Sequence, residues 1–123
     1  MSLDVSLISR EKIKKTCHHC NSEYEVDEQE VYWANITHNL GEMAREAGIY
    51  MYLWRPEELG ITIAKELIVP LESGLKLLKD KPSHFKKFNS ENGWGIYENF
   101  VPFVEDYLNA CKKYPESIID VYI

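Results

Sequence analysis

The sequence predicts an α+β fold in which a small antiparallel sheet, made of an N-terminal hairpin and a C-terminal strand, is covered by three to four helices. Residues 12–36 contain two β-prone stretches, residues 39–115 carry apolar residues at helical spacing, and residues 117–123 form a β-prone tail. The chain has 123 residues, of which 45% are apolar and 28% charged. Because this is the size and composition of one ordinary globular domain, we expect a single domain over residues 1–123.

The hairpin is predicted from alternation and β propensity. The first three residues, Met-Ser-Leu, look like an expression scar and receive no weight in this prediction. Tyr24 and Val26 alternate with acidic residues, as in a strand with one solvated face. Residues 31–36 are mainly apolar and aromatic, which is typical of a second strand. We expect the two strands to pair antiparallel around a polar turn at residues 27–29.

The helical body is predicted to begin after this second strand. Asn39 and Glu42 form a capping-box-like pair ahead of an apolar stripe, so a first helix is expected from Asn39. Gly48 weakens this helix, and Pro56 follows its expected end.

Two longer helical segments follow. The Thr62 hydroxyl suits the start of a second helix, and Pro70 within its apolar stripe predicts either a kink or two abutting helices. Residues 81–88 predict a short helix, and residues 96–114 predict the last one. The tail at 117–123 is expected to add a strand to the sheet or to pair two copies of the chain as a homodimer.

The string Cys17-His18-His19-Cys20 is the candidate metal site. Cys17 and Cys20 have the C-x-x-C spacing of two thiolate ligands to one tetrahedral zinc ion. The third cysteine, Cys111, lies in an apolar helical stripe, so a four-cysteine site is excluded. A mixed zinc site would have to recruit a histidine, with His38 the best placed and the others being His18, His19 and His84. The alternative is a plain turn with free thiols, in which case no cofactor is needed.

His38 is also the candidate catalytic residue. It stands between Thr37 and Asn39 at the predicted junction of strand and helix, where an imidazole would be placed to act as a general base. No nucleophile motif such as G-x-S-x-G accompanies it. The competing interpretation is a histidine that is hydrogen-bonded at a helix start for structural reasons.

Two further segments combine residue types that are common at recognition surfaces. Trp54 and Arg55 stand together at a predicted helix end, and Asn92 and Trp94 lie in a glycine-flanked loop before the last helix. The competing interpretation of Trp54 and Arg55 is a structural contact that joins helices. The competing interpretation of Trp94 is a core residue beneath a tight turn. The predicted ligand-binding residues are His38, Asn39, Trp54, Arg55, Asn92 and Trp94.

Charge and hydropathy narrow the class of partner. The formal net charge is −6, and five acidic residues without a basic one fall in the segment 21–30. Nucleic acid is therefore not an expected partner, because proteins that bind phosphate backbones usually carry a basic face. The chain contains no apolar run of the roughly 20 residues that a membrane helix needs, so we expect a cytoplasmic protein without a membrane partner.

Several spaced motifs resemble a family of small uncharacterised proteins encoded by bacteria and bacteriophages. They are C-x-x-C (17–20), N-I-T-H-N-L (35–40), M-A-x-x-A-G-I-Y (43–50), L-W-R-P-E-E (53–58), N-G-W-G-x-Y-E (92–98) and Y-L-N-A-C (107–111). The resemblance implies a free-standing intracellular protein of a prophage or another mobile element. It carries no site residue over to this chain.

These observations together predict a small accessory or regulatory binding protein without catalytic activity. Its partner is expected to be another protein or a small anionic ligand. Two alternatives stay open, a small hydrolase that uses His38 with or without a metal, and an adaptor stabilised by zinc at Cys17 and Cys20.

Overall fold

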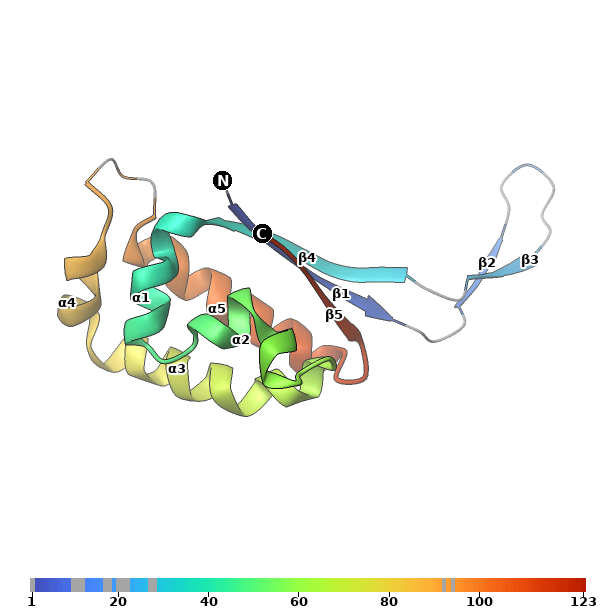
Figure 1. Ribbon diagram of the computed structural model, residues 1–123. Coiled ribbons are helices and arrows are strands. Elements are labelled where there is room, and N and C mark those ends of the chain that lie inside the picture. The colour runs from blue at the N-terminus through green and yellow to red at the C-terminus, as the bar shows by residue number, and fades with distance from the viewer. Residues whose placement is uncertain are drawn as a thin grey trace.

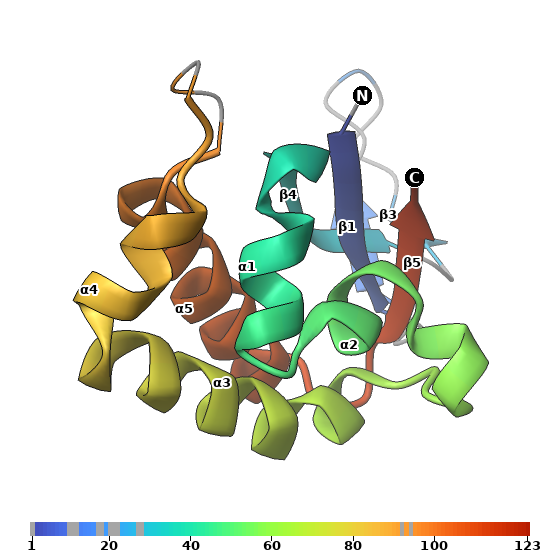
Figure 2. The same cartoon turned by 60° about the vertical axis from the view of Figure 1, so that its left-hand side comes forward.

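A three-stranded antiparallel sheet in the order β4–β1–β5 forms one layer of the protein (Figure 1). The computed structural model describes residues 2–9, 13–16, 19, 23–26, 29–91, 93 and 95–123. The helices lie on one side of the sheet, with α1 and α2 between α3 and the strands (Figures 1 and 2). The predicted α+β class, with a small antiparallel sheet and a C-terminal strand, is confirmed. The strands are β1 (Ser2–Ser9), β2 (Ile13–Thr16), β3 (Glu23–Val26), β4 (Gln29–Thr37) and β5 (Ile118–Tyr122).

The helical layer is built from short segments and two longer helices, α3 and α5, which pack against each other. Among the described residues, no helix is long and apolar enough to cross a membrane. The segments are η1 (His38–Leu40), α1 (Gly41–Glu46), α2 (Tyr50–Trp54), η2 (Pro56–Leu59), η3 (Ala64–Leu67), α3 (Ile68–Asp80), α4 (Pro82–Phe85), η4 (Lys86–Phe88) and α5 (Tyr97–Lys113).

Strand β1 occupies the centre of the sheet, and this corrects the prediction that the first three residues carry no weight. Leu3, Val5 and Leu7 point into the core and are each 0% exposed. Every second residue of this segment is apolar, which is the pattern of a strand with one buried face. Leu3 is the first apolar residue of this pattern, so the strand begins within the segment that was expected to lie outside the fold.

The predicted hairpin over residues 12–36 is wrong in its pairing. Strand β3 pairs with β2, whereas β4 pairs with β1 in a register that places Ile36 opposite Leu3 and Ala34 opposite Val5. Burial explains the choice, because the apolar face of β4 matches the apolar face of β1 and closes the core. The β2–β3 pair extends away from the helices beyond the Gln29 end of β4 (Figure 1).

Glycine and proline divide the helices as the sequence suggested. Gly48 adopts a φ of 76°, a conformation that favours glycine, and it separates α1 from α2. Of the two alternatives for Pro70, abutting segments are observed: η3 ends at Leu67, and Pro70 is in the first turn of α3. The predicted start at Thr62 is wrong, since the Thr62 carbonyl accepts a hydrogen bond from the Ile119 N–H at 3.0 Å and ties this segment to β5.

The core beneath β4 contains three weakly acidic groups. Tyr32 stacks on Tyr107 with ring centroids 5.8 Å apart, and Tyr107 and Cys111 of α5 are both 0% exposed. Burial raises the pKa of the Cys111 thiol to about 12 and that of Tyr32 to about 12, and it raises the pKa of Tyr107 well above its usual value. All three groups are therefore protonated in the folded protein at neutral pH.

Stability is expected to fall as the pH rises above about 9, the ordinary pKa of a cysteine thiol. The unfolded chain ionises Cys111 near that pH while the folded chain keeps its proton up to about 12, so ionisation favours unfolding throughout this window. Cys111 alone would lower the folding equilibrium up to about tenfold per pH unit. Urea unfolding from pH 8 to 11 should show a shallower decline for Cys111→Ala than for the wild-type chain. Parallel declines would contradict this assignment.

Candidate functional site

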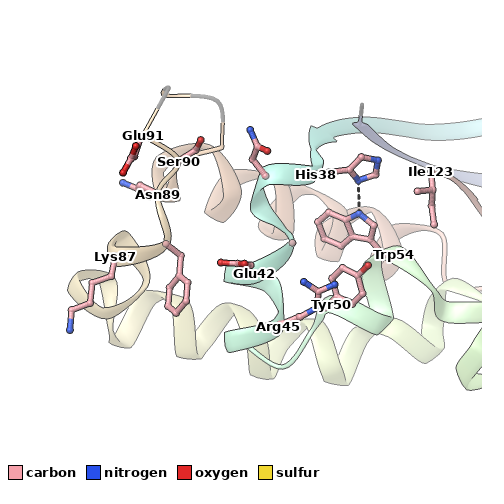
Figure 3. Close-up of a pocket in the computed structure, with 13 residues that line it drawn as sticks. His38, Glu42, Arg45, Tyr50, Trp54, Lys87, Asn89, Ser90, Glu91 and Ile123 are labelled. Atoms are coloured by element: carbon pink, nitrogen blue, oxygen red, sulfur yellow. Dashed lines mark hydrogen bonds between the residues drawn. The ribbon is translucent and has the colours of Figure 1, made fainter.

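A cleft of about 730 Å³ opens between the segment that starts at His38 and the segment 87–91 (Figure 3). The first wall comes from η1 and α1, the floor includes α2, and the second wall comes from η4 and the residues that follow it. The residues that line it include His38, Glu42, Arg45, Tyr50, Trp54 and Lys87.

Gly95 allows the second wall to approach the first. Its φ is +109°, and a Cβ atom at this position would lie 2.9 Å from Asn39 Cβ and 3.1 Å from Thr37 Cγ2. The Ser90 N–H donates to the Gly95 carbonyl at 3.1 Å, and the Tyr97 N–H donates to Asn89 Oδ1 at 2.8 Å. The segment after η4 is thereby fixed both to η1 and to the start of α5.

Four side chains form a continuous array along the cleft. The Arg45 guanidinium lies 4.0 Å from the centroid of the Tyr50 ring. The Tyr50 ring stacks on Trp54 with centroids 5.0 Å apart and an interplanar angle of 14°. The Trp54 indole N–H donates to His38 Nδ1 at 2.9 Å. Trp54 is only 2% exposed, so it anchors the array and offers little surface to a ligand.

The hydrogen bond from Trp54 determines the state of the His38 ring. An indole N–H only donates, so Nδ1 must carry the lone pair and, in the neutral ring, Nε2 must carry the proton. Nε2 is buried and has no hydrogen-bond partner among the described residues. The accepting nitrogen of His38 is therefore already occupied, and no carboxylate in the described part of the chain holds the ring. The hydrolase interpretation needs such a carboxylate or a metal.

The tautomer of His38 gives a direct test of this arrangement. In a long-range ¹H–¹⁵N correlation spectrum at pH 8, we expect Nδ1 as the unprotonated nitrogen and Nε2 as the protonated one, because the indole donates to Nδ1. Trp54→Phe should return the ring to a mixture of both tautomers. A protonated Nδ1 in the wild-type protein would contradict the observed bond.

Two cationic side chains on the cleft make no ion pair with any residue that the structure describes. These are Arg45, whose guanidinium lies over the Tyr50 ring, and Lys87 on the opposite wall. The residue before Lys87 behaves differently, since Lys86 Nζ lies 3.4 Å from a Glu98 carboxylate oxygen. Glu42 and Glu91 also line the cleft, so its formal charge is balanced.

The predicted site residues are only partly brought together. His38, Asn39 and Trp54 line the cleft, but Arg55 does not, and its Nε lies 3.9 Å from Glu58 Oε2 in a solvent-exposed pair. Asn92 and Trp94 lie outside the described residues.

Sequence reasoning missed Arg45, Tyr50 and Lys87. A signal was present for Tyr50, because it precedes Trp54 by four residues and shares a helix face with it.

The metal hypothesis stays a prediction. Cys17 and Cys20 lie outside the described residues, and the described residues contain no group of three or more His, Cys, Asp or Glu that could hold a metal ion. The role of His38 as their partner also stays a prediction, because it depends on where Cys17 and Cys20 lie. Zinc content of protein purified without added metal tests the hypothesis.

His84, another candidate zinc ligand, is engaged elsewhere. Its Nε2 lies 2.7 Å from Glu46 Oε1, and its ring packs edge-on against Phe85 and Phe88. Both partners of this pair are more than 40% exposed, so the contact joins α4 to the end of α1 at the surface.

A scan against models of protein families, a search of curated proteins and a search of solved structures each gave no significant match. The resemblance to bacterial and bacteriophage proteins therefore stays a prediction, and the function has to be argued from the cleft itself.

Proposed function

We propose that this protein is a non-catalytic binding module, with an accessory or regulatory role, that holds a small anionic ligand in the cleft. The observation that carries the proposal is the Arg45 guanidinium, which lies over the Tyr50 ring and makes no ion pair with the described residues. Stacking on an aromatic ring leaves the edge of a guanidinium available, and that edge matches a carboxylate or phosphate in two parallel hydrogen bonds.

The remaining lining residues limit the charge of this ligand. Lys87 adds a second cation on the opposite wall, whereas Glu42 and Glu91 would repel a second anionic group placed near them. Asn39 and Asn89 add amide groups to the walls. These features favour a ligand with one anionic group and an otherwise neutral structure.

The state of His38 favours binding over hydrolysis. A general base must accept a proton, but the Trp54 N–H occupies the lone pair of Nδ1, and Nε2 carries the proton of the neutral ring. In this state neither ring nitrogen of His38 offers an accessible lone pair. The hydrolase alternative would require the ring to change its tautomer first.

Titration of the ¹⁵N-labelled protein with inorganic phosphate and with benzoate tests the proposal. Phosphate presents an anion alone and benzoate presents an anion on a ring. We expect saturable shifts of the Arg45 side-chain N–H and the Trp54 indole N–H signals with at least one probe, because both groups belong to the array. Arg45→Gln should abolish saturation.

Arg55→Gln is the matched control, since it removes the same charge from an exposed arginine that does not line the cleft. This variant should bind as the wild-type protein does. The proposal fails if neither probe shifts the two signals, or if the two variants lose binding equally.

A further inference from the structure

The outer face of the three-stranded sheet carries an unusual combination of side chains. All helices of the described part of the chain lie on the other face (Figure 1). The register aligns Ser6 with Trp33 on β4 and with Asp120 on β5. It also aligns Asp4 with Asn35 and with Tyr122. Because paired residues point to the same side, these rows share the outer face.

Two large aromatic side chains on this face are exposed to solvent. Trp33 is 58% exposed and Tyr122 is 69% exposed. The solvated face of an antiparallel sheet is usually polar, so an indole in such a position is not required by the fold. Tryptophan and tyrosine are the residue types that most often dominate binding energy at interfaces.

The charged residues of the same face are all acidic. None of the residues of β1, β4 and β5 is Lys or Arg, and their charged residues are Asp4, Glu30 and Asp120. Asp4 Oδ1 accepts from Asn35 Nδ2 at 2.6 Å, and none of the three carboxylates is paired with a cation among the described residues. We call Trp33, Tyr122, Asp4, Glu30 and Asp120 the acidic aromatic face.

We propose that the acidic aromatic face docks a Lys- and Arg-rich segment of a partner protein. A guanidinium or ammonium group is attracted to the face of an indole or phenol ring, and it forms strong hydrogen bonds to carboxylates. In its own row, Trp33 on β4 lies two strands, about 10 Å, from Asp120 on β5. In the next row, Tyr122 on β5 lies one strand, about 5 Å, from Asp4 on β1. Successive cationic side chains of an extended segment therefore reach a ring and a carboxylate in each row.

Charge argues against a second copy of the same face as the occupant. In a symmetric face-to-face dimer, Asp4, Glu30 and Asp120 would meet the same carboxylates of the partner copy without an intervening cation. Like charges placed opposite each other disfavour such a pairing. A basic segment instead neutralises the face that it covers.

Fluorescence anisotropy with a fluorescein-labelled nona-arginine peptide tests this inference. Trp33→Ala leaves the net charge unchanged and removes an exposed side chain, so it should fold normally and weaken binding about tenfold. Asp4→Asn with Asp120→Asn should weaken binding at least as much. Glu57→Gln with Glu58→Gln removes the same charge from exposed positions on η2 and should leave the affinity nearly unchanged.

Other outcomes overturn the inference. Two results would mean that peptide binding depends only on the net negative charge of the protein. One is equal peptide affinity of Trp33→Ala and wild type. The other is a loss of affinity in the η2 control equal to that of the Asp4→Asn, Asp120→Asn variant. A dimer in sedimentation equilibrium that Trp33→Ala dissociates would assign the face to a second copy. The cleft is on the helical side, so Arg45→Gln should leave peptide binding intact, and the two proposals fail separately.

Discussion

Replacing Gly74 with alanine is expected to destabilise the fold by about 1–3 kcal/mol, although alanine is the better helix former. Gly74 is a buried residue within α3, and Ile49 packs directly on it. A Cβ atom at this position would overlap Ile49 Cγ2 and lie 3.2 Å from Ile49 Cδ1. Because Ile49 is only 1% exposed, its side chain has no solvent to move into.

A second substitution separates this overlap from other effects. Ile49→Ala removes both contacting carbon atoms, so Gly74→Ala should cost much less stability in that background than in the wild-type chain. Ser73→Ala, at the exposed neighbour in the same helix, should change stability by less than about 0.5 kcal/mol. Urea unfolding measures all four variants. A Gly74→Ala variant that is more stable than wild type would show that helix propensity outweighs packing here.

The parts of the fold that follow from local periodicity were predictable. The apolar stripe of α5 and the β propensity of the tail each identify an element within its own residues. Strand pairing is different, because it depends on which distant strand offers a matching apolar face. Tyr24 and Val26 looked like the natural partner of residues 31–36, and only the buried face of β1 shows why β4 pairs elsewhere.

The candidate site, too, was predictable only where a residue stands out within its own segment of the sequence. His38 and Trp54 stand out in the sequence as polar and aromatic residues at the ends of elements, yet they are 16 positions apart and their hydrogen bond depends on how α2 packs. In the sequence alone, Lys87 is indistinguishable from any solvent-exposed lysine. In the structure it belongs to η4, which places it at the cleft. Arg55 adjoins Trp54 in the sequence, but adjacent residues at a helix end point about 100° apart, and Arg55 does not line the cleft.

Leu3→Ala is expected to cost about 2–5 kcal/mol, a large share of the stability of a domain this size. Leu3 is 0% exposed, lies on the central strand and is aligned with Ile36 on β4, which is itself 8% exposed. Truncation would leave a cavity between the sheet and the helices that the neighbouring strands cannot close without shifting register. Urea or thermal unfolding measures the loss.

Ile8→Ala provides the matched control on the same strand. Ile8 is also a branched aliphatic residue, but it is aligned with Glu30 and Ile118 on the outer face and stays partly exposed. Its truncation should cost less than half as much as that of Leu3, because fewer buried contacts are lost. If the first three residues were a remnant outside the fold, Leu3→Ala would be as stable as the wild-type chain. That result would contradict the placement of β1 between β4 and β5.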